Sequence, residues 1–307
     1  MYNVQVLLSS YNGEKYIARQ LDTILAQKGV EVSVLVRDDG STDRTTDILK
    51  DYEEKYSNIS VIYSDNIGVV ASFFELFKRC NHECDFFALS DQDDVWDEDK
   101  LLVACNKLTK NVKSYKTTPA MYCCEPEITD ENLNPICDVS VQGKRVRPSF
   151  QNALLENIAK GGGIVFSNSL LPYIENGKPE YVYMHDWWIY LTASCFGKVF
   201  YDPRKHYKYR QHSGNVLGAA PSGRALMKRR LAQSKTNKGH VSRQARAFAK
   251  FFSKQNISDK NQKSLDIICN YNTSFRKRLA GFSGRYLYRQ GKRDNLIFRV
   301  LFFTNHL

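Results

Sequence analysis

The first 110 residues alternate between short apolar runs and stretches in which apolar residues recur every three or four positions. The runs predict strands at residues 3–9, 30–36, 59–63 and 86–89. The amphipathic stretches predict helices at residues 14–27, 44–56 and 69–79. Because strand and helix alternate with short connections, the pattern predicts an α/β fold with a parallel, doubly wound sheet.

The second half of the chain has a less regular pattern. Short strands are expected at residues 120–124, 136–139 and 161–166, a helix turn at 153–158, and a helix from His185 onward. A strand-like stretch follows within 202–218, and residues 224–307 have helical spacing. The chain therefore continues the α/β body to about residue 219 and ends in a helical segment.

Polar residues follow three of the four predicted N-terminal strands. Tyr11, Asp39 and Asp91 occupy these positions, and parallel strands place such ends at one edge, where α/β folds bind ligands. The chain has no G-x-G-x-x-G loop and no Walker lysine. A nucleotide bound at this edge would therefore need a metal ion to neutralise its phosphates.

Asp91 and Asp93 are the candidate ligands for Mg²⁺ or Mn²⁺, which prefer oxygen ligands and accept one or two carboxylates plus substrate phosphates. Their spacing alone leaves helix capping and metal binding equally open. Capping explains residues 97–99 well, because they directly precede the apolar helix that begins near Lys100. It explains Asp91 and Asp93 poorly, because they lie before that helix.

Three segments together resemble the signatures of inverting family 2 glycosyltransferases with the GT-A fold. They are SSYNG at 9–13, VRDDGSTD at 36–43 and SDQDDVW at 90–96, and the last is similar to the branch of bacterial rhamnosyltransferases acting on cell-surface polysaccharides. The resemblance covers about residues 1–215. It implies a mostly parallel, Rossmann-like sheet flanked by helices and a nucleotide-sugar donor linked to dTDP or UDP.

The same resemblance implies roles for individual residues. Ser9 and Tyr11 would contact the nucleobase, and Asp39 would accept a hydrogen bond from its N3–H. Asp91 would meet the ribose or the metal, and Asp93 would bind the divalent cation on the donor diphosphate. Asp43 is expected to cap the helix that follows it.

Two further features concern the donor. Members of the family often carry a basic residue soon after the loop glycine, whereas Val69 and Val70 follow Gly68 here. Glycines at 161–163 would let the backbone approach a ligand closely, although a flexible turn is an equally good interpretation. In the family a glycine at this position faces the donor sugar, which makes Gly162 and Gly163 candidate substrate-binding residues.

Asp186 is the candidate catalytic base. Inverting sugar transfer needs a carboxylate that takes the proton of the acceptor hydroxyl, and in the family an acidic residue at a helix start in this position does so. Trp187 and Trp188 would stack on sugar faces or exclude water. The structural alternative makes Asp186 a helix cap and the two tryptophans core residues.

Arg210 and His212 alternate along a strand-like stretch, so their side chains should share one face. Arg210 suits a phosphate. His212 would complete the metal site or bind the leaving diphosphate, as similar R-x-H segments do in relatives.

Charge is distributed unevenly over the 307 residues. Residues 220–307 carry 20 Lys and Arg against three acids, a charge of +17, which leaves −6 on residues 1–219. The expected domains are therefore a catalytic domain at 1–219, with a nucleotide-binding half at 1–112 and an acceptor-side half at 113–219, and a basic helical region at 220–307. That region suits an anionic membrane surface or a second copy of the chain as partner. No RNA-binding motif is present, so no nucleic-acid partner is expected.

No leader-like or membrane-spanning apolar segment is found, and the eight cysteines lack CxxC spacing. The expected location is therefore the cytoplasm, at the inner face of the membrane. The predicted activity is metal-dependent, inverting transfer of a sugar onto a lipid-linked or polysaccharide acceptor. The preferred candidate for the sugar is L-rhamnose, with dTDP-rhamnose as the donor. The alternatives are an aspartyl-phosphate phosphohydrolase using Asp91 and a non-catalytic, membrane-associated nucleotide-sugar-binding protein.

Overall fold

The computed structural model describes residues 1–137, 146–177, 179–212 and 239–304. These form two compact units. Unit 1 contains residues 1–142, 159–177 and 197–219, and unit 2 contains residues 143–158, 178–196 and 220–307. Unit 1 leaves out residues 143–158 and 178–196, which the predicted catalytic domain at 1–219 includes, and that division of the chain into domains stays a prediction.

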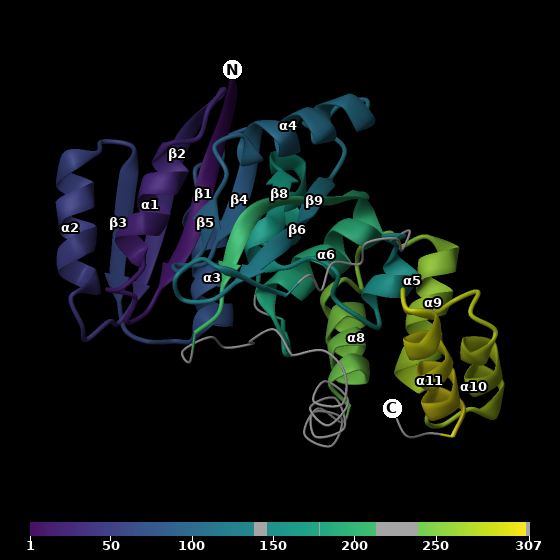
Figure 1. Ribbon diagram of the computed structural model, residues 1–307. Coiled ribbons are helices and arrows are strands. Elements are labelled where there is room, and N and C mark those ends of the chain that lie inside the picture. Colours follow the sequence, from purple (N-terminus) through teal and green to yellow (C-terminus); the bar gives the residue numbers. More distant parts are fainter. Residues whose placement is uncertain (138–145, 178, 213–238, 305–307) are drawn as a thin grey trace. The chain divides into compact units, whose positions relative to one another are not determined.

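Unit 1 is built on one sheet, for which the described residues supply nine strands (Figure 1). Its strands are β1 (Tyr2–Ser10), β2 (Val30–Asp39), β3 (Ile59–Ser64), β4 (Phe86–Ser90), β5 (Val95–Trp96), β6 (Ala120–Thr129), β7 (Pro135–Cys137), β8 (Ile164–Ser167) and β9 (Lys198–Arg210). The strand order is β3-β2-β1-β4-β8-β6-β9-β5, with β7 paired to β6. The predicted strands of the N-terminal half are thus confirmed.

The sheet changes direction after its fourth strand. β1 to β4 are parallel, whereas β8 runs antiparallel to both β4 and β6. β6 and β9 are again parallel, and β5 pairs antiparallel with β9. The sheet is therefore mixed, with its parallel part in the predicted nucleotide-binding half.

Helices cover both faces of this sheet. The helices of unit 1 are α1 (Ile17–Leu25), α2 (Thr45–Lys55), α3 (Val69–Arg79) and α4 (Lys100–Asn111), with 3₁₀ turns η1 (Gly161–Gly163) and η2 (Asn168–Tyr173). Apolar residues of α1, α2 and α4 share one core with alternate residues of β1, such as Val4 and Val6. α3 packs on the other face, where Phe77 contacts Phe166 and Phe166 stacks on Phe87. Burial on both faces explains why these strands read as continuous apolar runs.

The acids before α4 do not cap it by a side-chain hydrogen bond. Asp99 is the residue preceding the helix, and its carboxylate lies 3.5 Å from Nδ1 of His206 instead. Glu98 forms an ion pair with Lys28. These acids lie near the positive end of the helix dipole, as expected, but their contacts tie α4 to other parts of unit 1.

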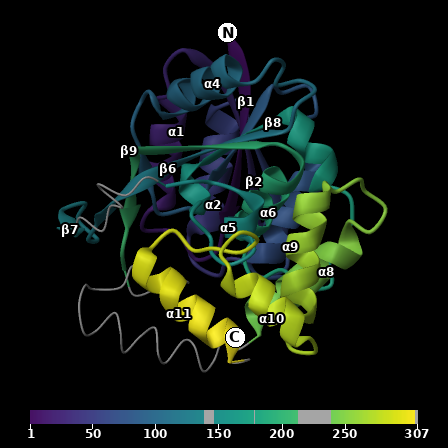
Figure 2. The same ribbon diagram turned by 90° about the vertical axis from the view of Figure 1, so that its right-hand side faces the viewer.

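Unit 2 is helical in the residues described (Figure 2). It contains α5 (Phe150–Ala153), α6 (His185–Phe196), α8 (His240–Phe251), α9 (Asp259–Asn270), α10 (Phe275–Phe282) and α11 (Lys292–Phe303). Its core is aromatic: Trp188 of α6 packs against Phe248 and Phe252. The predicted C-terminal helices are confirmed for residues 240–303.

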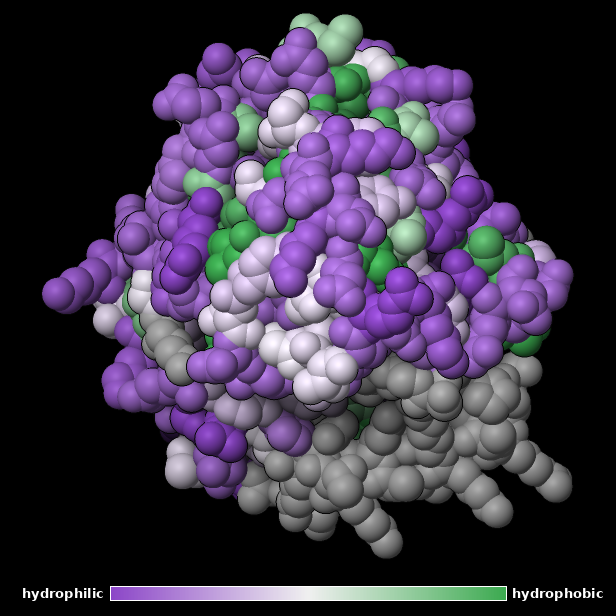
Figure 3. Space-filling model, turned by 90° about the vertical axis from the view of Figure 1, so that its left-hand side faces the viewer, coloured by the Kyte–Doolittle hydropathy of each residue, from purple (hydrophilic) through white to green (hydrophobic). Residues whose placement is uncertain are grey.

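No helix within the described residues is both long and apolar enough to cross a membrane. The seven cysteines described are free thiols, five of them buried. The face of the molecule on the side of α2 and β3 is mostly hydrophilic, with hydrophobic residues in small separate areas (Figure 3).

Candidate active site

The strand ends predicted to converge are neighbours in the sheet. Ser9 of β1 is in register with Arg37 of β2, and Leu8 is in register with Ser90 of β4. The three motifs of the sequence therefore meet at the carboxyl edge of the parallel strands, which is where α/β sheets bind ligands.

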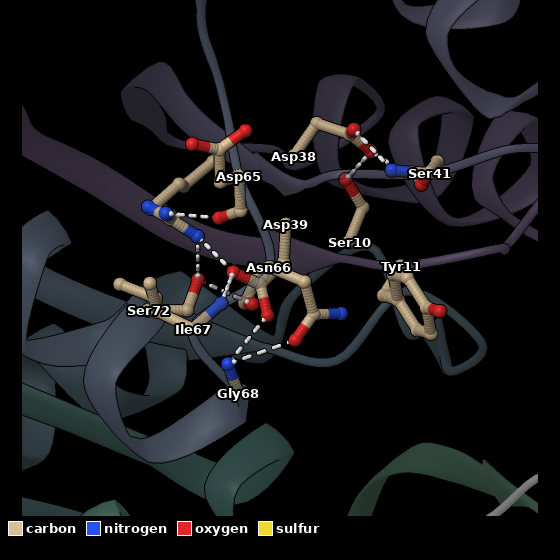
Figure 4. Close-up of polar contacts among 12 residues, drawn as sticks. Ser10, Tyr11, Asp38, Asp39, Ser41, Asp65, Asn66, Ile67, Gly68 and Ser72 are labelled. Atoms are coloured by element: carbon tan, nitrogen blue, oxygen red, sulfur yellow. Dashed lines mark hydrogen bonds and ion pairs between the residues drawn. The ribbon is translucent and has the colours of Figure 1, made fainter.

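Asp39 organises the loop that precedes α3 (Figure 4). Its two carboxylate oxygens accept hydrogen bonds from the backbone N–H groups of Ile67 and Gly68, both at 2.9 Å, and it forms a buried ion pair with Arg37. Gly68 has φ of +82°, which a side chain would disfavour. A carboxylate has about four acceptor sites, so Asp39 retains capacity for a nucleobase N–H.

Arg37, which forms the ion pair with Asp39, also contacts the loop before α3 and the first turns of α3. Its guanidinium donates to the carbonyl oxygen of Asp65 at 2.9 Å and to the hydroxyl of Ser72 at 3.4 Å. Ser72 in turn lies 2.7 Å from the hydroxyl of Ser9. Ser9 and Asp39, both predicted base contacts, thus belong to one polar network, and Arg37 joins them through Ser72 although no role was predicted for it from the sequence.

Asp38 and Asp43 serve the turns around this site. Asp38 accepts hydrogen bonds from the hydroxyl of Ser10 at 3.0 Å and from the N–H of Ser41 at 2.9 Å (Figure 4). Asp43 accepts from the N–H of Thr45 at 3.0 Å, in the first turn of α2. Asp43 thus accepts from one N–H of the first turn, but Arg44 is the residue at the N-cap position of α2, and a capping role of Asp43 stays a prediction.

Gln92 joins the acidic turn to the first motif. Its Oε1 accepts from the N–H of Tyr11 at 2.8 Å, and its Nε2 donates to the carbonyl oxygen of Tyr11 at 2.9 Å. A Cβ atom at Gly13 would collide with the Gln92 amide. Gln92 was not among the predicted site residues; its signals in the sequence are its place between two candidate ligands and the glycine in the facing turn.

Asp93 meets the R-x-H segment at the end of β9. Its Oδ2 lies 2.7 Å from Nε2 of His212, and its carbonyl oxygen accepts from Nε of Arg210 at 3.0 Å. The ring of Tyr16 contacts both, with its centroid 4.8 Å from the His212 ring and 4.6 Å from the Arg210 guanidinium. Arg210 also donates to the carbonyl of Glu131, so this one side chain links the acidic turn to the loop between β6 and β7.

The donor set at this turn fits a divalent cation that also binds a diphosphate. The described residues contain no group of three or more His, Cys, Asp or Glu side chains poised around one ion. A pair such as Asp93 and His212 is still adequate, because Mg²⁺ sites commonly use one or two carboxylates and take the remaining ligands from substrate phosphates and water. Asp91 is half-buried in the same turn.

Asp94, which follows Asp93 in the chain, is buried. Both of its carboxylate oxygens are buried without a hydrogen-bond partner within the part of the chain described. Burial, with the neighbouring charges of Asp91 and Asp93, raises its pKa well above the usual range. Lys100, also buried, lies 3.2 Å from the centroid of the Trp96 ring, and burial lowers its pKa to about 8.

The glycines of η1 have a packing reason in this environment. A Cβ atom at Gly162 would collide with the Asp94 carboxylate and lie 2.9 Å from the ring of Tyr207. One at Gly163 would lie 2.7 Å from the carbonyl oxygen of Cys124. The backbone of η1 therefore lies so close to neighbouring residues of unit 1 that both positions require glycine. Contact of either glycine with a donor sugar stays a prediction.

Asp186 lies in the first turn of α6, at the helix start that the sequence predicted, and it belongs to unit 2. It is half-buried, and its Oδ1 accepts from the N–H of Trp187 at 2.6 Å. Trp187 is 9% exposed and donates from Nε1 to the carbonyl oxygen of Ala153 at 2.7 Å, while Trp188 is completely buried. The core interpretation of both indole rings is thus supported, and stacking of Trp187 on a sugar stays a prediction.

His185, next to Asp186, is buried, and burial lowers its pKa to about 3. The imidazole is therefore neutral near neutral pH. It therefore places no positive charge next to the Asp186 carboxylate. Such a charge would make the carboxylate a weaker base.

A comparison with family models matches residues 5–151 to "Glycosyl transferase family 2". The "dTDP-rhamnosyl transferase RfbG" of Shigella flexneri is 30% identical over 255 residues, which cover 79% of this chain and 84% of that protein.

Solved structures agree in fold. Staphylococcus aureus TarS residues 1–349 in complex with UDP-GlcNAc has a TM-score of 0.58 at 17% identity, covering 100% of this chain and 89% of that one. Mannosyltransferase PcManGT from Pyrobaculum calidifontis, in complex with GDP-Man and Mn²⁺, has a TM-score of 0.51 at 15% identity, covering 99% of this chain and 81% of that one. The predicted GT-A type of α/β fold is confirmed.

Proposed function

The chain belongs to glycosyl transferase family 2 and is a glycosyltransferase, and we propose that it transfers L-rhamnose from dTDP-rhamnose to a hydroxyl group of a lipid-linked or polysaccharide acceptor. The Shigella relative supports the choice of donor, because it covers most of both chains and is named a dTDP-rhamnosyl transferase. Family membership favours this activity over the aspartyl-phosphate phosphohydrolase and over non-catalytic binding.

The observation that carries the proposal is the joining of the acidic turn to the nucleoside end of the sheet. Gln92 and Asp93 belong to the same turn. The Gln92 amide binds the backbone of Tyr11, and the Asp93 carboxylate pairs with His212. A nucleoside diphosphate fits this arrangement, with its base near Asp39 and Tyr11 and its diphosphate near Asp91 and Asp93. A divalent Mg²⁺ or Mn²⁺ held by Asp91, Asp93 and His212 would neutralise the charge of the departing diphosphate.

Asp186 acts as the base in the proposed mechanism. The acceptor oxygen attacks C1 of the sugar from the face opposite the diphosphate and forms the new C–O bond. Its proton passes to the Asp186 carboxylate as the bond between C1 and the phosphate oxygen breaks, and dTDP leaves. The configuration at C1 is thereby inverted.

The place of the reaction follows from the acceptor. A lipid-linked glycan is held at a membrane, and the basic region at 220–307 suits the anionic inner leaflet. We therefore place the enzyme in the cytoplasm, attached peripherally to that leaflet.

The test is Asp186→Asn, which keeps the size of the side chain and removes its basicity. Transfer should fall by about 100-fold or more, the contribution typical of general base catalysis. Binding of dTDP-rhamnose, measured by calorimetry, should stay within about twofold of the unsubstituted enzyme, since a base contributes little to donor affinity. Loss of donor binding together with transfer would remove Asp186 from this role, and turnover of another nucleotide-sugar in preference to dTDP-rhamnose would refute the proposed donor.

A further inference from the structure

Exposed apolar side chains are concentrated at the C-terminal end of unit 2. Within the described residues, 13 large hydrophobic side chains are exposed, and eight of them lie between residues 275 and 303. Six of the eight repeat one spacing, i, i+4 and i+7, on each of two helices. They are Phe275, Leu279 and Phe282 on α10, and Leu296, Val300 and Phe303 on α11. Such spacing places three side chains on one side of a helix.

The two triads are continuous. The ring of Phe303 lies 5.7 Å from that of Phe275 and 5.8 Å from that of Phe282, measured between centroids. The six residues therefore form one surface, which we call the C-terminal apolar face. A contiguous apolar surface of this kind usually marks a binding site.

This exposure does not result from poor packing between the helices, because α10 and α11 have a core of their own. Phe302 and Phe298 of α11 are buried, and the Phe302 ring stacks on Tyr271 at 4.7 Å. A Cβ atom at Gly281 of α10 would collide with the Phe302 ring, so the helices approach closely there. α11 thus buries one apolar side and exposes another, and α10 packs against the buried side through Gly281.

The residues around the C-terminal apolar face are strongly basic. Residues 275–303 contain eight Lys and Arg but one acid, Asp294. Lys277 pairs with Asp266 and Arg289 with Glu156. For Arg276 and Arg278 no acidic partner occurs in the described ranges, which leaves positive charge beside the exposed apolar residues.

We infer that the C-terminal apolar face binds an anionic lipid bilayer, with its apolar side chains entering the interface and the nearby basic residues meeting phosphate headgroups. Short amphipathic helices with basic residues on their polar side bind membrane surfaces in this way. A protein partner of ordinary composition would not require so large an excess of positive charge. The inference rests on the proposed membrane location and assigns it to a defined surface.

The experiment is sedimentation of the full-length protein with vesicles of phosphatidylcholine alone or mixed with phosphatidylglycerol. The protein should sediment with the mixed vesicles, and added salt should release it. Leu296→Glu/Val300→Glu should reduce partitioning about tenfold or more, because it removes two apolar side chains from the interface. Arg276→Gln and Arg278→Gln should each reduce it about fivefold.

Ile136→Glu is the matched control. Ile136 is 53% exposed, similar to Leu296 at 61% and Val300 at 50%, but it lies in β7 of unit 1. Its substitution should leave vesicle binding unchanged, and circular dichroism should show all variants folded.

Absence of vesicle binding, or equal binding by Leu296→Glu/Val300→Glu, would overturn the inference. The inference would also be overturned if the protein formed an oligomer that this variant dissociates and did not bind vesicles, since the face would then be a subunit interface. Transfer to a soluble acceptor is assayed in parallel: its failure with vesicle binding intact would count against the proposed function alone.

Discussion

At the scale of single residues, the candidate ligands are held by side chains from distant parts of the chain. Asp93 is fixed by His212 and Arg210, more than 100 residues later, and Tyr11 is fixed by Gln92. Preorganised hydrogen bonds of this kind reduce the cost of binding, because the site need not be ordered when the donor arrives.

Gln92→Ala should weaken binding of dTDP by about 30-fold, since it removes two hydrogen bonds of about 1 kcal/mol each from the backbone of Tyr11. Calorimetric titration with dTDP measures this loss. Inhibition by inorganic pyrophosphate provides the control, because pyrophosphate has no base and should bind the variant as it binds the unsubstituted enzyme. Equal losses for both ligands would mean that Gln92 acts on the diphosphate end.

Gly162→Ala should lower the free energy of unfolding by about 1–3 kcal/mol, the usual cost of overpacking. The added methyl group would meet Asp94 and Tyr207. Urea denaturation measures the change. Combining it with Asp94→Ala, which frees the space, should recover part of the loss, and strictly additive effects would show that the two residues are not in contact.

At the scale of elements, the sequence predicts local structure well where one periodicity dominates. The four parallel strands and their helices have regular apolar patterns, because the apolar side chains are the ones they bury. Their observed limits differ from the predicted ones by a few residues. The antiparallel position of β8 could not be predicted, because it depends on pairing Phe87 with Phe166 across the chain. Gln92 was missed for the same reason, since its partner lies 81 residues away.

The start of α6 carries a titratable group whose effect on stability can be predicted. Burial lowers the pKa of His185 to about 3, whereas a histidine in an unfolded chain has a value near 6.5. The unfolded state therefore binds more protons between these values, and the free energy of unfolding should fall as the pH drops from about 6.5 towards 3. His185→Asn should flatten this part of the pH profile.

Urea unfolding of both proteins at several pH values measures the two slopes. The slope is compared and not the absolute stability, because the substitution itself changes packing at every pH. The carboxylates contribute equally to the pH profiles of the unsubstituted protein and the variant, so they cancel when one slope is subtracted from the other. Identical slopes would show that His185 titrates normally in the folded protein.

At the scale of the whole molecule, the chain divides its predicted chemistry between two units. Asp39, Asp91, Asp93 and His212 belong to unit 1, whereas Asp186 belongs to unit 2, together with the C-terminal apolar face. Donor binding should therefore depend on unit 1, and a ligand that binds only the folded state stabilises the part of the protein that holds it.

A panel of dTDP-, UDP- and GDP-sugars, each with and without Mn²⁺, tests this division by thermal unfolding. At 100 times its dissociation constant, the correct donor with Mn²⁺ should stabilise the protein by about 2.7 kcal/mol. For a unit of this size such a gain should raise the melting temperature by about 5–10 °C.

The dTDP-sugar should give the largest shift, and Asp93→Ala should abolish the dependence on Mn²⁺, because it removes a predicted metal ligand. Leu296→Glu/Val300→Glu is the matched control, since its substitutions lie in unit 2 and leave every predicted donor contact intact. A full shift without metal would refute the metal dependence, and an equal shift with all three bases would refute base reading by Asp39.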